Sequence, residues 1–168
     1  MNDSIEMIDF EKPKLPSALN VLTILSIIGC ILQFVGAVFT FYTAKTSYDN
    51  RHETIAAMTS EDVPAVFKNM MGDPNEMLEM ITKSYESRIP ILILSLVAVG
   101  LCFYGVLQMR KLKKQGFMLY VIGELLPFVI MAVFIGTMAM SGLQFGISVF
   151  IALLFILLYA LQRKHLIY

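Results

Sequence analysis

The sequence is poor in charged residues and rich in apolar ones. Only 15% of its 168 residues are Asp, Glu, Lys or Arg, whereas 57% are hydrophobic. Soluble domains usually contain about 25% charged and about 45–50% apolar residues, so the composition excludes a disordered chain and disfavours an ordinary soluble enzyme. Basic and acidic residues number 13 each, and this balance leaves no overall positive field to attract nucleic acid.

Residues that carry common chemistry are scarce as well. Cys30 and Cys102 are too few for a disulfide framework or a four-thiolate metal site. His52 and His165 belong to segments expected on opposite sides of a membrane, so they cannot converge on one site. The sequence has no HExxH zinc motif, nucleophile elbow, P-loop or dinucleotide fingerprint. We therefore expect a protein that is not an enzyme and that uses neither a metal nor another cofactor.

What the sequence does have is long runs without charge. Residues 15–44 and 89–109 carry none, and after Lys114 only Glu124 interrupts the apolar sequence before Arg163. A spanning helix needs about 20 apolar residues, and it must be helical because lipid cannot satisfy an open strand edge. The last run is long enough for two spans, with Ser141 and Gly142 at the turn. The predicted fold is an all-α four-helix transmembrane bundle, a single domain over 17–168 behind an N-terminal tail (1–16), with spans at 17–44, 90–110, 115–140 and 143–162 and an outer loop over 45–89.

The orientation follows from Lys and Arg residues near the ends of the spans. Residues 110–114 hold four positive charges in five positions, and four spans place Arg163 and Lys164 on the same side as Lys12 and Lys14. The large loop instead carries more acidic than basic residues. Because short basic loops stay in the cytoplasm, both termini are predicted to be cytoplasmic.

The large loop should contain an amphipathic helix beginning near residue 74. Asp73 can cap it, Pro74 suits its first position, and Glu76 falls where a capping box places an acid. Apolar residues then recur at steps of three and four, which predicts a helix that lies on the membrane surface or caps the bundle. Gly72 can end a preceding helix, for which residues 59–62 offer a start.

Small and weakly polar residues form stripes along the spans. Such stripes let helices approach closely in lipid, where no hydrophobic force drives their association. The simplest packing turns the stripes of the first two spans toward each other inside a left-handed bundle, whereas the pair in the last span suits either an internal contact or a homodimer face. The candidate helix-packing residues are Gly29, Gln33 and Gly36 in the first span, Gly105 in the second, and Gly142 and Gly146 at the start of the fourth.

Glu124 is the only charged-type residue inside a predicted span. It lies about 12 Å along its helix from the basic edge at a rise of about 1.5 Å per residue, and an ionisable group there is costly and suggests function. Ser26 and Tyr104 lie at similar depths and are the expected hydrogen-bonding partners. Pro127 should free the carbonyl of Gly123 and bend the helix. The group pins the third span to the first two, holds a proton or cation in a transport or ligand role, or lies in a wet vestibule on the inner side.

Residues 108–127, together with residues 14–20, resemble a stretch of uncharacterised small four-helix integral membrane proteins of bacteria. The resemblance covers about a quarter of the chain. It implies a four-helix fold and the bacterial cytoplasmic (inner) membrane, and it is tied to no activity.

These observations favour a non-enzymatic multi-pass membrane protein that acts as an accessory, assembly or scaffold subunit. Its expected partners are the lipid bilayer and either another membrane protein or further copies of itself. A second hypothesis is a small oligomeric transporter or channel that uses Glu124 as a proton- or cation-coupling carboxylate. A third is lipid or surface sensing through the loop helix and the basic turn at 110–114, since basic clusters beside a span attract anionic lipid.

Overall fold

The chain folds as an all-α polytopic bundle. The computed structural model describes residues 15–60, 63–64, 73–136, 140 and 143–167. In this part of the chain four helices are long and apolar enough to cross a membrane. They are α1 (Ser17–Asp49), α5 (Arg88–Arg110), α6 (Gln115–Ile130) with its continuation η1 (Met131–Ile135), and α7 (Leu143–Gln162).

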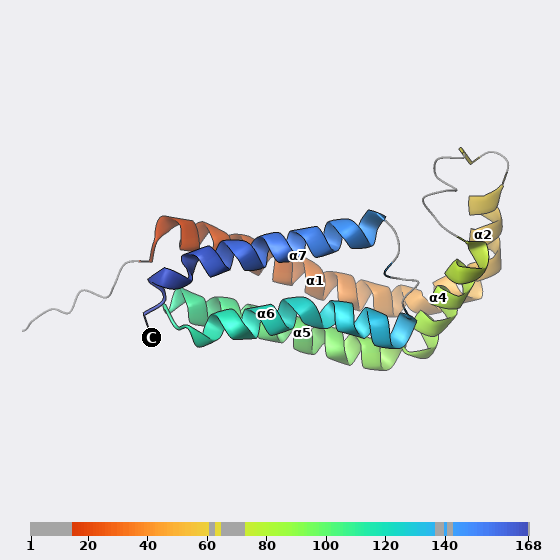
Figure 1. The fold of residues 1–168 in the computed structure, drawn as a ribbon. Coiled ribbons are helices and arrows are strands. Elements are labelled where there is room, and N and C mark those ends of the chain that lie inside the picture. Colours follow the sequence, from red (N-terminus) through yellow and green to blue (C-terminus); the bar gives the residue numbers. More distant parts are fainter. Residues whose placement is uncertain (1–14, 61–62, 65–72, 137–139, 141–142, 168) are drawn as a thin grey trace, which may run out of the picture.

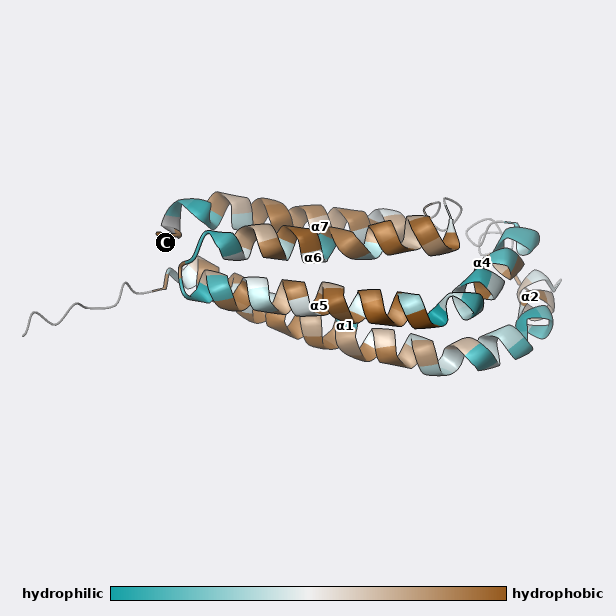
Figure 2. Cartoon of the chain, turned by 90° about the horizontal axis from the view of Figure 1, so that it is seen from below, coloured by the Kyte–Doolittle hydropathy of each residue, from teal (hydrophilic) through white to brown (hydrophobic). Residues whose placement is uncertain are grey.

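The four long helices run side by side along one direction (Figure 1). Two shorter helices, α2 (Arg51–Thr59) and α4 (Pro74–Glu86), lie at one end of this bundle. The start of α1, the turn between α5 and α6, and the end of the described chain lie at the other. The middle of the bundle is coloured hydrophobic and both ends are more hydrophilic (Figure 2), as a membrane-spanning orientation requires.

The observed spans match the predicted ones with three differences. The second helix begins at Arg88, two residues before its predicted start. The first helix continues to Asp49, five residues beyond its predicted end. The third ends at Ile135 rather than at residue 140, because Gly136 adopts φ 103° and ψ 173°, a combination almost restricted to glycine. Helix α6 continues through Pro127, and the helix widens into the π-helical segment η1 only four residues later. The turn predicted at Ser141 and Gly142 lies outside the described residues.

Helices α5 and α6 form the most closely packed pair in the bundle. Three glycines make this approach possible. A Cβ atom on Gly105 would lie 2.7 Å from the backbone nitrogen of Tyr120, and one on Gly116 would lie 2.5 Å from the carbonyl oxygen of Gly105. A Cβ on Gly123 would lie 2.7 Å from the backbone nitrogen of Cys102. Any larger side chain at these positions would push the two helices apart.

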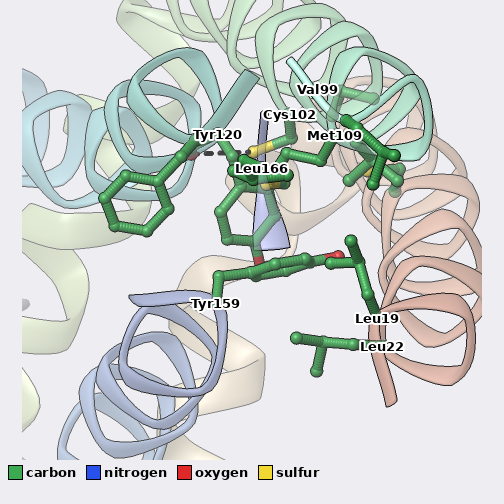
Figure 3. Packing of buried hydrophobic residues seen from close by; sticks show 12 residues of the cluster. Leu19, Leu22, Val99, Cys102, Met109, Tyr120, Tyr159 and Leu166 are labelled. Atoms are coloured by element: carbon green, nitrogen blue, oxygen red, sulfur yellow. Dashed lines mark hydrogen bonds between the residues drawn. The ribbon is translucent and has the colours of Figure 1, made fainter. Parts of the chain in front are cut away.

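The remaining helices pack around this hairpin unequally. Helix α1 contacts α5 extensively, whereas α7 makes far fewer contacts with α1 and α6. The buried apolar cluster therefore gathers near the basic end of the bundle, and Figure 3 shows Tyr159 extending from α7 toward Leu19 and Leu22 of α1. Much of the surface of α7 faces outward, so this helix is anchored mainly through a few large side chains.

The basic turn between α5 and α6 is closed by a Schellman motif with a leucine in its left-handed position. Leu112 has φ 58°, its N–H donates to the Met109 carbonyl (2.9 Å), and the Lys113 N–H donates to the Gln108 carbonyl (3.0 Å). Glycine usually occupies this position. Leucine fits here because its side chain is buried in the core, with 5% exposed. The Leu112 carbonyl also accepts the Ile167 N–H at 2.9 Å, which holds the end of α7 against the turn.

The end of the bundle opposite the α5–α6 turn is covered by α4, and the predicted start of this helix is confirmed. The Asp73 side chain accepts from the Asn75 N–H at 2.8 Å, and Pro74 is the first residue of the helix. The preceding segment differs from the prediction, because Thr59 ends α2 instead of starting a helix. Residues 61 and 62 of the predicted helix start lie outside the described residues, and so does the predicted helix stop at Gly72.

A four-layer stack ties α4 to the C-terminal end of α1. The Tyr48 and Tyr85 rings stack with centroids 4.4 Å apart and planes 14° from parallel. Arg51 lies 4.1 Å from the centroid of Tyr48, and Arg88 lies 4.3 Å from the centroid of Tyr85. Stacked rings and cation–π contacts each contribute about 0.5–1.5 kcal/mol. The stack therefore holds α4 over the membrane end of the bundle.

Candidate functional site within the membrane

Glu124 lies on the inner side of α6 and contacts α5. The Cys102 thiol is 3.6 Å from its Oε2 and is positioned to donate to it. The same sulfur lies 3.8 Å from the carbonyl oxygen of Tyr120, and Tyr120, one turn earlier on α6, lines the same cavity as Glu124. Because a thiol is a weak donor, the carboxyl keeps most of its capacity for a further partner.

The carboxyl borders a small cavity between α1, α6 and α7. Its volume is about 150 Å³, and its polar lining comes from Ser26 and Gln33 on α1 and from Tyr120 and Glu124 on α6. Cys30 on α1 adds a buried thiol to the lining. Apolar residues of α7 close the opposite wall. A space of this size can hold a few water molecules, each of which occupies about 30 Å³ in the liquid.

The hydrogen bond of the Ser26 side chain is to α7 rather than to Glu124. The Tyr159 hydroxyl donates to the Ser26 Oγ at 2.9 Å, and the Tyr159 and Tyr120 rings pack with centroids 4.7 Å apart. Both aromatic residues are buried. Ser26 thus lines the cavity beside Glu124, as its depth predicts, while its hydrogen bond joins α1 to α7.

The prediction that Tyr104 partners Glu124 is wrong. Tyr104 is 54% exposed on the outside of α5, and its hydroxyl accepts from the Gln108 side chain at 2.7 Å. Its depth matches that of Glu124, but its rotation about the helix axis turns it away from α6. Cys102, two positions earlier, occupies the inward face instead. The sequence alone did not connect Cys102 with the carboxyl.

The packing stripes meet different neighbours from those predicted. Gly105 lies in a close helix contact, but its partner is α6 rather than the stripe of α1. Gly116 and Gly123 complete that contact, and sequence reasoning missed both of them, although their spacing around Tyr120 repeats the steps of four and three.

On α1, Gly29 and Gly36 are exposed, and no atom lies within 4 Å of a Cβ built on either. The predicted contact between these residues and α5 is therefore wrong, because α5 uses its small-residue face for α6. Gly146 is also exposed with open space beside it. Gly142 lies outside the described residues.

Gln33 stands out on this exposed face of α1. Its side chain is exposed on a span whose mean hydropathy is 2.4. It borders the cavity of Glu124, and its amide makes no hydrogen bond to any residue that the structure describes. Burying an amide in hydrocarbon without a partner costs about 2–7 kcal/mol, depending on the reference. The Gln33 side chain is therefore energetically unfavourable at this position unless a group outside the monomer forms a hydrogen bond with its amide.

The described residues of the site suit hydrogen bonding and the holding of a proton, water or a single cation. Within the described ranges, no group of three or more His, Cys, Asp or Glu residues is arranged to hold a metal ion. The site combines one carboxyl, two separated thiols, two phenols and one unpaired amide. Comparison of the chain with protein-family models, with curated proteins and with solved structures gives no match.

Proposed function

We propose that this chain is a non-enzymatic multi-pass protein of the bacterial inner membrane that works as an accessory or assembly subunit. It binds a transmembrane helix of a partner protein along α1, beside α7. The observation that carries this proposal is the unpaired, lipid-facing amide of Gln33. Both termini lie in the cytoplasm, an orientation supported by the basic residues at 110–114 and 163–164.

The surroundings of Gln33 suit a close helix contact. Gly29 and Gly36 lie one turn before and one turn after it, and both leave open space above the α1 backbone. A partner helix can therefore come near enough for its own Asn, Gln, Ser or Thr side chain to pair with the Gln33 amide. Such interhelical hydrogen bonds contribute about 0.6–2 kcal/mol in membranes. The Glu124 carboxyl behind Gln33 gives a longer polar side chain a second acceptor.

Photo-crosslinking in native membranes tests this proposal. A photoreactive amino acid replaces Leu32, which is 67% exposed next to Gln33, and a control replaces Val133, which is 69% exposed on η1. We expect a discrete protein adduct from position 32, lost in a Gln33→Leu background and retained with Gln33→Asn. Adducts of equal strength from both positions, or an adduct unaffected by Gln33→Leu, would refute the proposal. An adduct with a second copy of this chain would replace the foreign partner by a homo-oligomer.

The cavity beside Glu124 favours a second candidate, a small proton- or cation-coupled transporter. Its support is an intramembrane carboxyl on a polar cavity that also holds Ser26 and Tyr120. Reconstituted liposomes with a pH-sensitive dye inside test it. This candidate requires proton flux that Glu124→Gln abolishes and that Val133→Leu, on the exposed face of η1 away from the cavity, preserves. Flux at the level of empty liposomes, from protein shown to be folded, rules it out.

A further inference from the structure

A second and larger cavity lies at the outer end of the bundle, about 30 Å along α1 from Ser17 at a rise of about 1.5 Å per residue. Its volume is about 360 Å³, and its walls come from α1, α4, α5 and Ile135 of η1. The hydrocarbon core of a membrane is about 30 Å thick, so the cavity sits where the outer leaflet meets water. It is also distinct from the cavity of Glu124, because the two share no lining residue.

The cavity has one cationic lining residue and an apolar depth. Arg88 begins α5 at the membrane edge, and Ser95, which also lines the cavity, lies about 10 Å further into the membrane on the same helix. Between these levels the wall is mainly apolar, with Phe41, Ile91 and Leu92 among the lining residues. The space therefore has its single charge at the membrane surface and a largely apolar wall below it, interrupted by hydroxyl groups such as that of Ser95.

Arg88 is held in place but has no acidic partner among the described residues. Its guanidinium lies over the Tyr85 ring, which itself stacks on Tyr48. The nearby Lys83, by contrast, forms an ion pair with Glu79 at 2.6 Å. A positioned, unpaired guanidinium presents donors in a fixed fork that matches a carboxylate in two-point hydrogen bonding. The Ser84 hydroxyl, which lines the same cavity and has no side-chain partner in the described part of the chain, offers another donor.

We propose that this outer cavity binds a single-chain anionic amphiphile of the fatty-acid type. The carboxylate pairs with Arg88 at the membrane surface, and the hydrocarbon chain enters the apolar depth between α1 and α5. The volume favours one chain over two, because about 300–1,000 Å³ is the range of small-molecule pockets and this cavity lies near its lower end. The proposal is independent of the Gln33 surface, which lies on the exposed face of α1 nearer the middle of the membrane.

The test uses the full chain in phosphatidylcholine nanodiscs with a photoreactive palmitic acid as the probe. After irradiation, mass spectrometry locates the labelled peptides. We expect saturable labelling of peptides containing Phe41 or Ile91 that excess palmitate removes and hexadecanol does not. An Arg88→Gln variant should lose at least tenfold in labelling, while Arg51→Gln, on the far side of the tyrosine stack, keeps it. Competition by hexadecanol, or equal labelling of the two variants, would overturn the proposal.

A second variant guards against misfolding of Arg88→Gln. Ala37→Leu adds apolar volume to the lining and leaves the charge of Arg88 intact, so it should weaken palmitate labelling through space alone. Unchanged labelling in folded Ala37→Leu would contradict the assignment. A photoreactive phosphatidylglycerol run in parallel separates the two lipid classes. Stronger saturable labelling by that two-chain lipid than by palmitic acid would overturn the single-chain assignment.

Discussion

Gly123 of α6 lies directly against the backbone of Cys102 in α5. A Cβ at Gly123 would meet the Cys102 nitrogen and its Sγ at 2.7 Å each, and the Ala98 carbonyl oxygen at 2.8 Å. The same contact places the Cys102 thiol beside the Glu124 carboxyl. One glycine therefore sets both the spacing of the central helix pair and the position of the thiol that contacts the intramembrane acid.

Gly123→Ala should destabilise the bundle strongly. Overpacking a helix contact costs about 1–3 kcal/mol, and the clash here is with backbone atoms that cannot rotate away. The free energy of unfolding can be measured by SDS titration of the protein in detergent micelles. Gly100→Ala on α5 is the matched control, because nothing lies within 4 Å of its Cβ. It should be neutral or slightly stabilising, and equal losses for both variants would contradict the close contact.

At position 112 a glycine variant should be more stable than an alanine variant, which is the reverse of the usual order in a helix. Leu112→Ala loses a buried side chain, at about 2–5 kcal/mol, and keeps the cost of a left-handed backbone, about 1–2 kcal/mol. Leu112→Gly loses the same packing but relieves the backbone, so it should be about 1 kcal/mol more stable than Leu112→Ala. The same SDS titration measures both. Greater stability of the alanine variant would show that the left-handed turn does not persist in solution.

The Tyr159–Ser26 hydrogen bond should anchor α7. We expect Tyr159→Phe to lower the free energy of unfolding by about 0.6–2 kcal/mol, the range for hydrogen bonds between membrane helices. Ser26→Ala should cost little more in the Tyr159→Phe background, because both changes remove the same bond. Tyr42→Phe is the control, since that residue is 75% exposed on α1. Additive losses in the double variant would show that the two side chains do not interact.

The tyrosine stack should control how firmly α4 is held. Tyr85→Leu removes a ring pair and a cation–π contact, each worth about 0.5–1.5 kcal/mol. The backbone amides of α4 should then exchange with deuterium about tenfold faster or more, since about 1.4 kcal/mol corresponds to a factor of ten. Hydrogen-exchange mass spectrometry gives this readout. Faster exchange confined to α1 would point to another role for Tyr85.

The four basic residues of the α5–α6 turn should set the orientation. Replacing Arg110, Lys111, Lys113 and Lys114 by asparagine removes the densest positive cluster. A reporter that fluoresces only in the cytoplasm, fused to the C-terminus, should be bright in the parent protein and lose most of its signal in the variant. An unchanged signal would assign the orientation to other residues.

The position of each residue along its helix could be predicted from the sequence. The direction in which each side chain faces around the helix axis could not. The spans follow from hydropathy, and the cap at Asp73 depends only on residues two positions away. The partner of Glu124 depends on helix rotation. Tyr104 and Cys102 differ little in depth, yet only Cys102 faces α6. In a soluble protein polarity would mark the outward face, but in lipid both faces of a span are apolar.

The helix contacts predicted from the small-residue stripes were wrong for a related reason. Small residues mark where another helix can approach closely but do not identify that helix. Gly105 meets α6, whereas Gly29 and Gly36 of α1 meet nothing described. The sequence drew attention to Gly123 only through its carbonyl, which Pro127 should leave without a partner. Its role in packing against α5 was therefore missed. The end of the third span at Gly136 was missed because the apolar run continues beyond it.

Helix α1 runs without a break from Ser17 to Asp49, about 50 Å at a rise of about 1.5 Å per residue. It is therefore longer than the hydrocarbon core of a membrane, which is about 30 Å thick. Near its C-terminal end Tyr48 holds α4 through the tyrosine stack. Within the bundle Gln33 and Ser26 line the cavity of Glu124. A change in the tilt of α1 at the end that holds α4 would displace the wall of that cavity, so the tyrosine stack and the polar site share one rigid element.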